Sequence, residues 1–150
     1  MTLFSRTPNH QPLRETMKTI LSILLVALCA PALPCDRMEG AWQLVYAIYK
    51  EEATGKVLEE NKGDKDKSMK ILSKKNFSFI TIDKDGKFSV AAAGTWSLEP
   101  GKYVEVVNMS SMDRLMSKTY RFDCKLKDGL WIHSGKEDHL LIEEHWKRLD

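Results

Sequence analysis

Residues 40–50 read GAWQLVYAIYK, and this stretch predicts the first long strand of the fold. Large apolar and aromatic side chains recur at every second position, so we expect Trp42, Leu44 and Tyr46 on one face. Gly40 stands just ahead, where a residue without a side chain lets the chain turn sharply or lets another backbone come close. A Gly-x-Trp that opens a long strand, followed by a series of short strands, is typical of a small closed β-barrel.

Short segments rich in β-branched and aromatic residues follow along the rest of the chain. They lie at residues 68–72, 76–82, 87–98, 103–108, 118–126, 130–133 and 140–149. Glycine-bearing turns such as 83–86 and 99–102 separate them, which is the pattern of antiparallel hairpins. Residues 51–67 are polar and charged, so we expect a long solvated loop there. The pattern predicts an all-β fold of about eight to ten short antiparallel strands, either a sandwich or a barrel.

The front of the chain carries the features of an export signal. Residues 19–28, TILSILLVAL, form an apolar run that is too short to span a bilayer and suits the core of a signal peptide. Small residues at the spacing that a signal peptidase reads predict cleavage after Ala32, and Met17 suits the start of such a signal. We therefore expect an N-terminal extension and signal peptide over 1–32, followed by a single domain over 33–150.

Export places the mature chain in the periplasm or outside the cell, without a transmembrane segment. A lipid anchor fits less well, because Cys29 follows a leucine and Cys35 follows a proline, where a lipoprotein signal needs a small residue. Only Cys35 and Cys124 would survive processing, in a compartment where disulfides form. Two outcomes stay open for these cysteines: one bridge between them, or two unpaired thiols.

The charge of the chain argues against two classes of partner. The sequence has 23 Lys+Arg and 21 Asp+Glu, a formal net charge of +2, and the excess lies in residues 1–32. The remaining residues carry equal numbers of both signs, mixed along the chain. A neutral, mixed surface gives no electrostatic reason to bind nucleic acid or an anionic membrane.

No catalytic motif stands out in the sequence. It lacks the Gly-x-Ser-x-Gly, His-Glu-x-x-His, phosphate-loop and Cys-x-x-Cys patterns, so it favours a binding protein over an enzyme. An enzyme would use Glu105 or Glu144 as general acid or base. His133, His139 and His145 could hold a metal or haem iron if two of them met inside a barrel, but ordinary histidines fit their positions better. We therefore expect no metal and no cofactor.

The alternation of the later segments places charged residues on inward faces. If Trp146 points inward, Glu144 and Arg148 point inward with it. On another strand Glu105 stands two residues from Tyr103, so the two side chains share a face there as well. Buried charges need partners. One interpretation is an amphipathic cavity that binds a small molecule with one polar end, and its predicted lining is Tyr46, Tyr103, Glu105, Glu144, Trp146 and Arg148. The other is that the carboxylates and Arg148 pair with each other near the barrel mouth and only brace it.

The Gly40-x-Trp42 pair resembles the opening signature of lipocalins and their calycin relatives, in which the Trp closes the base of the barrel. In those proteins a basic residue of the last strand packs across the Trp, and Arg148 is the matching residue here. The chain also resembles small exported lipocalin-like domains of unknown function from Gram-negative gut anaerobes, in the order of its segments at 40–45, 70–72, 94–98, 103–105 and 144–149. The resemblance implies an up-and-down barrel of about eight or more strands and an exported location. It implies no established activity.

We expect an exported lipocalin-like binding protein that holds a small hydrophobic or amphipathic molecule in the barrel interior. The alternative is a protein-interaction or inhibitor module of the cell envelope, which would contact a protein partner through its rim loops at 51–67 and 109–117. A retained small molecule would favour the first, and a stoichiometric protein partner would favour the second.

Overall fold

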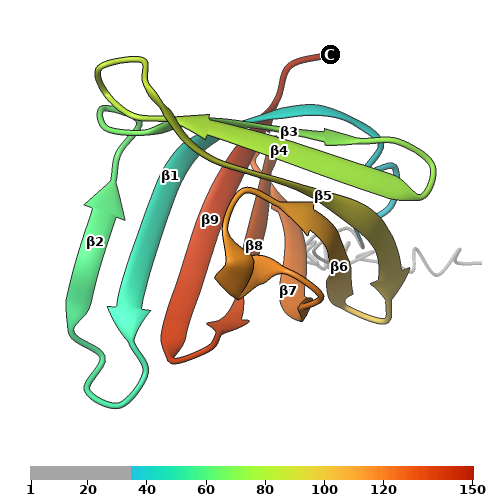
Figure 1. The fold of residues 1–150 in the computed structure, drawn as a ribbon. Coiled ribbons are helices and arrows are strands. Elements are labelled where there is room, and N and C mark those ends of the chain that lie inside the picture. The colour runs from blue at the N-terminus through green and yellow to red at the C-terminus, as the bar shows by residue number, and fades with distance from the viewer. Residues whose placement is uncertain (1–34) are drawn as a thin grey trace, which may run out of the picture.

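The computed structural model describes residues 35–150, and within them the chain forms nine β-strands and one turn of 3-10 helix (Figure 1). The elements are β1 (Gly40–Glu51), β2 (Val57–Asn61), β3 (Lys67–Leu72), β4 (Asn76–Ile82), β5 (Phe88–Glu99), β6 (Lys102–Ser110), η1 (Asp113–Leu115), β7 (Thr119–Lys127), β8 (Leu130–Glu137) and β9 (Leu140–Arg148). No helix in this part of the chain is long and apolar enough to cross a bilayer. The predicted signal peptide, the start at Met17 and Cys29 lie outside the described residues.

Eight of the strands close into an antiparallel up-and-down barrel. From β3 to β9 each strand pairs with the next along the chain, and β1 pairs with both β3 and β9, which closes the ring. Closure pairs main-chain groups around the whole cylinder, which a flat sheet of the same strands would leave open at two edges. The structure therefore confirms the predicted all-β antiparallel barrel, and it is compatible with a lipocalin-like fold.

The ninth strand, β2, corrects the prediction of a continuous loop over residues 51–67. It pairs with residues 47–50 of β1, and β3 pairs with residues 40–43 of the same strand. Figure 1 shows β2 at the side of the barrel, beside β1. Most of its side chains are exposed, so its sequence lacks the alternation that marks a half-buried strand. Main-chain pairing with β1, more than burial, makes this segment a strand.

A β-bulge in β1 changes which of its side chains face inward. Leu44 pairs with Trp146, but the next residue to pair is Tyr46, with His145, so β1 has one extra residue at this point. Leu44 is buried before the bulge and Ala47 is buried after it. The prediction that Tyr46 shares the face of Leu44 is therefore wrong, because a bulge leaves no mark in the sequence periodicity.

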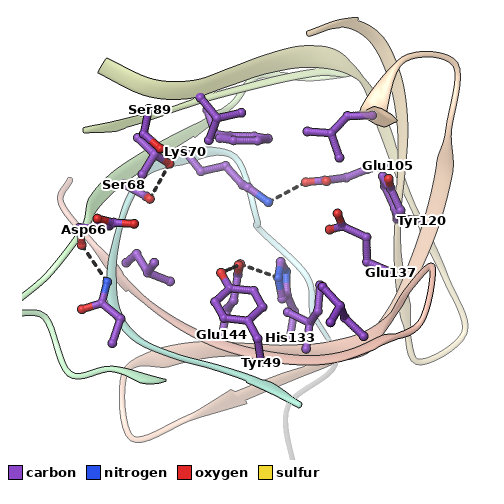
Figure 2. Close-up of a pocket in the computed structure, with 18 of the residues that line it drawn as sticks. Tyr49, Asp66, Ser68, Lys70, Ser89, Glu105, Tyr120, His133, Glu137 and Glu144 are labelled. Carbon is purple, nitrogen blue, oxygen red and sulfur yellow. Dashed lines mark hydrogen bonds and ion pairs between the residues drawn. The ribbon is translucent and has the colours of Figure 1, made fainter. Parts of the chain in front are cut away.

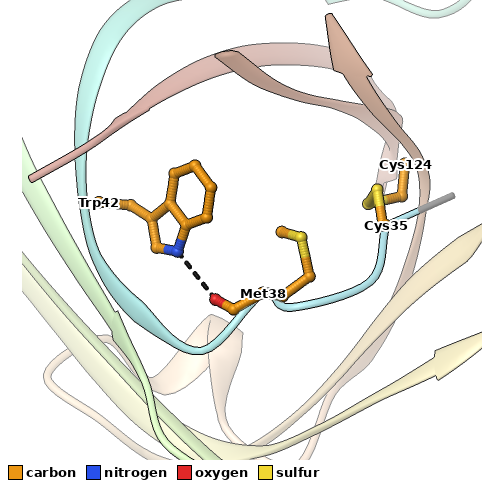
Figure 3. Close-up of a disulfide and its surroundings, with 4 residues drawn as sticks. All are labelled: Cys35, Met38, Trp42 and Cys124. Carbon is orange, nitrogen blue, oxygen red and sulfur yellow. Dashed lines mark hydrogen bonds between the residues drawn. A yellow bond between two sulfur atoms is a disulfide. The ribbon is translucent and has the colours of Figure 1, made fainter. Parts of the chain in front are cut away.

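Residues 35–39, just ahead of β1, close the end of the barrel at which β1 begins (Figure 3). Met38 is almost fully buried there, and its carbonyl oxygen accepts a hydrogen bond from Trp42 Nε1 at 2.9 Å. Cys35 is joined to Cys124 of β7 by a disulfide, with the two Cα atoms 6.0 Å apart. Of the two outcomes open for these cysteines, the structure has the bridge, which ties the segment to the barrel wall.

Gly40, Trp42 and Arg148 also meet at this closed base. The Arg148 guanidinium lies 4.4 Å from the centre of the Trp42 ring, and its Nη1 donates a hydrogen bond to the carbonyl oxygen of Glu39 at 2.7 Å. Gly40 has a φ of +136°, a backbone conformation that favours glycine, and a Cβ atom there would lie 2.6 Å from Arg148 Nη1. The structure thus brings together the three residues that the sequence predicts at the barrel base.

Candidate functional site

A cavity of about 460 Å³ lies inside the barrel, toward the end opposite the closed base (Figure 2). Its wall comes mostly from inward-facing residues of the strands, so rigid elements shape it. The apolar part of the lining includes Leu44, Phe79, Val107, Phe122, Ile142 and Trp146. Polar side chains that face the same space include Ser68, Lys70, Glu105, Tyr120, His133, Glu137 and Glu144. The volume falls within the usual range of small-molecule sites, roughly 300–1,000 Å³.

Lys70 of β3 forms a buried ion pair with Glu105 of β6. Lys70 Nζ lies 2.6 Å from Glu105 Oε1, and the two side chains are only 4% and 6% exposed. Tyr103 donates a hydrogen bond to the same carboxylate oxygen at 2.7 Å. Five aromatic rings surround the ammonium with their centres 5.0–5.9 Å away, those of Phe77, Phe79, Tyr103, Trp131 and Trp146. The carboxylate and the rings together offset the cost of burying the charge.

A second buried cluster joins His133 of β8, Glu144 of β9 and Tyr49 of β1. His133 Nε2 lies 2.7 Å from Glu144 Oε2, and Tyr49 donates a hydrogen bond to Glu144 Oε1 at 2.8 Å. The His133 ring also stacks on Phe122, with ring centres 4.4 Å apart. Burial alone would raise the pKa of Glu144, but the neighbouring His133 and Lys70 outweigh it and lower this pKa to about 2. Glu144 is therefore a carboxylate at neutral pH.

The lowered pKa of Glu144 predicts a specific loss of stability in acid. Because the folded-state pKa is depressed, Glu144 stabilises the fold fully above its ordinary pKa of 4.5, and this contribution is lost as the pH falls toward 2. We expect the contribution to be about 3 kcal/mol of the free energy of unfolding. The free energy of unfolding, measured with urea from pH 6 to pH 2, should fall by about this amount less in Glu144→Gln than in the unchanged protein.

The matched control for this prediction is Glu143→Gln. Glu143 is the neighbouring residue on the outer face of β9, with its side chain 48% exposed. In this variant the free energy of unfolding should fall between pH 6 and pH 2 by as much as in the unchanged protein. An equal decrease in the two variants would contradict the role assigned to Glu144.

At the end opposite the base, the connection between β6 and β7 covers part of the cavity. Its 3-10 turn, η1, brings Arg114 and Leu115 into the lining. Arg114 forms an ion pair with Glu137 at the end of β8, and Lys118 forms one with Asp138 at 3.2 Å. These two exposed pairs link the connection to the turn between β8 and β9, across the barrel mouth.

Tyr120 of β7 faces the cavity without a hydrogen-bond partner among the described residues. The residue is 7% exposed, and its hydroxyl oxygen is buried. Burial, helped by the nearby Glu137 carboxylate, raises the pKa of Tyr120 to about 12, so the hydroxyl is protonated at neutral pH. A buried hydroxyl without a partner costs roughly 1–3 kcal/mol, and a bound molecule could supply that partner.

The residues predicted to bind a ligand fall into three groups. Three of them line the cavity: Glu105, Glu144 and Trp146. Tyr103 is fully buried and contacts the cavity lining through its hydrogen bond to Glu105. Tyr46 lies on the outer face of β1 and Arg148 lies at the closed base, so neither of them lines the cavity.

The bracing interpretation holds in part, but with different partners. Glu105 pairs with Lys70, and Glu144 pairs with His133, whereas Arg148 packs on the Trp42 ring at the base. The Lys70–Glu105 pair therefore crosses the interior from β3 to β6, the His133–Glu144 pair joins the adjacent strands β8 and β9, and both pairs face the cavity.

Sequence reasoning did not select Lys70, His133 or Tyr120 as site residues. For Lys70 the alternation predicts an outward-facing side chain, because its two neighbours in β3 are apolar; those neighbours are nevertheless exposed. His133 and Tyr120 each stand two residues from a buried aromatic residue, Trp131 and Phe122 respectively. That alternation is a signal that would have placed both side chains inside.

The interior of the barrel combines paired charges with apolar rings. Within residues 35–150 no group of three or more His, Cys, Asp or Glu side chains is arranged to hold a metal ion. Lys70, Arg114 and His133 each pair with a carboxylate of the lining, and apolar rings complete it. Such a space can hold a molecule with an apolar body and a polar end. No protein-family model matches the chain, and no curated protein matches it significantly.

Proposed function

We propose that the protein is an exported, lipocalin-like binding protein that holds a small, partly apolar molecule inside its barrel. The observation that carries this proposal is the interior cavity of about 460 Å³, which the protein's own side chains leave open. The apolar body of the ligand would lie against Phe79, Ile142 and Trp146. Its polar end would meet the polar groups that face the same space.

Two observations support an exported location. The apolar run at 19–28 has the length of a signal-peptide core, and a disulfide such as Cys35–Cys124 persists in oxidising compartments. We infer a periplasmic or secreted protein. A lipid anchor on Cys35 is disfavoured, because its sulfur is bonded to Cys124 and is not free for modification.

The pairing of the interior charges supports binding over catalysis. A general acid or base must exchange a proton with its substrate, and its partner groups must leave it free to do so. Glu105 already accepts from Lys70 and Tyr103, and Glu144 accepts from Tyr49 on one oxygen and faces His133 on the other. The main role of both carboxylates is therefore to stabilise the barrel wall through these contacts.

A second candidate function is a protein-interaction or inhibitor module that acts through the rim of the barrel. Large apolar side chains are exposed along the rim segments 51–67 and 109–117. They are Val57, Leu58, Met109 and Met116, and each is between 40% and 64% exposed. Exposed apolar side chains of this kind are a feature of protein-binding surfaces. A stoichiometric protein partner that co-purifies with the chain would favour this candidate.

Native mass spectrometry of the protein purified from its own host tests the first proposal. We expect a small molecule that adds to the mass under native conditions and leaves on denaturation. Ser89→Trp adds a bulky ring at the exposed edge of the cavity lining and should reduce the fraction of protein that keeps the added mass. Ser78→Trp, on the exposed outer face of β4, is the matched control and should keep it. Absence of any retained molecule, or equal retention by the two variants, would contradict binding in the cavity.

A further inference from the structure

The side chains that line the cavity carry an excess of negative charge. Two basic residues belong to the lining, Lys70 and Arg114. Five acidic residues belong to it: Glu59, Asp66, Glu105, Glu137 and Glu144. The acids outnumber the cations even when His133 is counted as protonated. Because the other acids are paired, the excess comes from Glu59, which is exposed, and Asp66, which is half-buried, at the edge of the cavity. Their negative potential favours the entry of a cation over that of an anion.

Both basic groups of the lining are already paired. Lys70 Nζ lies 2.6 Å from Glu105 Oε1, and Arg114 pairs with Glu137 at the mouth. Glu59 and Asp66 form no ion pair within the described part of the chain. A ligand carboxylate would therefore find no free cation in the lining, and could gain one only by separating a pair that the protein already makes.

Lys70 demonstrates that this interior accommodates an ammonium group. A carboxylate and five aromatic rings hold its Nζ, although the side chain is only 4% exposed. The cavity offers a ligand the same two kinds of partner, because rings also line it, those of Tyr49, Phe79, Tyr120, Phe122 and Trp146. Aromatic faces attract cations, and more strongly where water is excluded.

The hydroxyl of Tyr120 is an independent sign of a ligand at the mouth. It is buried, it faces the cavity near Glu137, and it has no partner among the described residues (Figure 2). The hydroxyl oxygen can accept a hydrogen bond from an ammonium N–H, and the Glu137 carboxylate can accept a stronger, charge-assisted one. The two groups together form an acceptor pair that suits an amine.

We propose that the ligand carries a protonated amine, which docks between Glu137 and Tyr120 while its apolar body extends toward Phe122 and Ile142. This inference rests on the proposed binding function and names the chemical class of the ligand, a small organic amine with an aromatic or aliphatic body. The amine takes the place of Arg114, whose side chain is 56% exposed and can turn out to solvent. Exchange of one cation for another keeps Glu137 paired.

Three probes with one indole body and different head groups test the charge preference: tryptamine, tryptophol and indole-3-propionate. Their affinities for the mature protein are measured by isothermal titration calorimetry at pH 7, after any retained molecule has been removed by unfolding and refolding. We expect tryptamine, the cation, to bind about tenfold or more tightly than indole-3-propionate, the anion. The neutral alcohol should fall between them.

Variants at the mouth assign the preference to particular residues. Glu137→Gln removes the carboxylate and should narrow the affinity gap between tryptamine and indole-3-propionate. Arg114→Gln frees Glu137 and should widen it. Asp123→Asn is the matched control, because it removes one exposed carboxylate that pairs with Lys102 on the outer face of the barrel. It should leave the gap unchanged.

Equal affinities for the three probes, tighter binding of the anion, or failure of all three to bind would overturn the amine proposal. So would a gap that Asp123→Asn narrows as much as Glu137→Gln does. The binding function itself is judged separately by the retained molecule. A neutral or anionic molecule released from the cavity would leave that function standing and would remove only its assignment to amines.

Discussion

Replacement of Lys70 by methionine is expected to lower the free energy of unfolding by about 3–5 kcal/mol, the usual result of removing one partner from a buried ion pair. The physical reason is that Glu105 would stay inside the barrel without its cation, with its side chain only 6% exposed. Methionine has a similar length and fills much of the same space between the rings. The loss therefore reports the unpaired carboxylate more than a cavity. Urea unfolding of the disulfide-bonded protein at pH 7 measures it.

Two further variants keep this prediction open to contradiction. Addition of Glu105→Gln to Lys70→Met removes the orphaned charge and should recover much of the loss, because the amide oxygen can still accept from Tyr103. Lys102→Met breaks the exposed pair with Asp123, whose side chains are 42% and 55% exposed, and should change stability by about 0–1 kcal/mol. Equal losses for Lys70→Met and Lys102→Met would show that the interior pair is solvated.

The buried pairs explain how a barrel with charged residues inside can be stable and still hold an open cavity. Glu105 on β6 has Lys70 of β3 as its partner across the interior, and Glu144 on β9 has His133 of the adjacent β8. Paired charges cannot collapse into the space as apolar side chains would, because they would lose their partners. The same pairs thus help to keep the cavity open and make part of its lining polar.

The inward faces were predictable wherever a strand keeps its regular alternation. Tyr103 and Glu105 of β6 share one face with Val107, and Glu144 and Trp146 of β9 share another, as their spacing indicates. Period two is a property of the extended backbone itself, so it needs no knowledge of neighbouring strands. This is why the barrel and part of its cavity lining could be predicted from the sequence.

The remaining site residues depend on pairing between strands, which periodicity does not report. Tyr46 faces outward because a bulge shifts β1 against β9, and Lys70 faces inward because its carboxylate partner lies on β6, far along the chain. In β3 the apolar Met69 and Ile71 are exposed while the charged Lys70 is buried, which inverts the usual rule for a half-buried strand. Only the register of the closed barrel shows that a partner is present.

Removal of the disulfide, by Cys35→Ser together with Cys124→Ser, is expected to lower the free energy of unfolding by about 4–5 kcal/mol. The two cysteines are 89 residues apart, so the bond closes a long loop and strongly restricts the unfolded chain. It also holds the segment that carries Met38 under the Trp42 ring, where the Trp42 Nε1 donates to the Met38 carbonyl. Urea unfolding of the oxidised protein and the double variant, compared at the same pH, measures the difference.

Reduction of the unchanged protein separates the bond from the substituted side chains. If the stabilisation comes from the covalent link, dithiothreitol should lower the unfolding midpoint of the unchanged protein to that of the double variant and should leave the variant unaffected. The barrel should still fold in both cases, because β1 pairs with β3 and β9 independently of the bond. Equal midpoints for the oxidised protein and the double variant would mean that the packing of Met38 and Trp42 alone holds the closed base, and that the bond adds nothing to it.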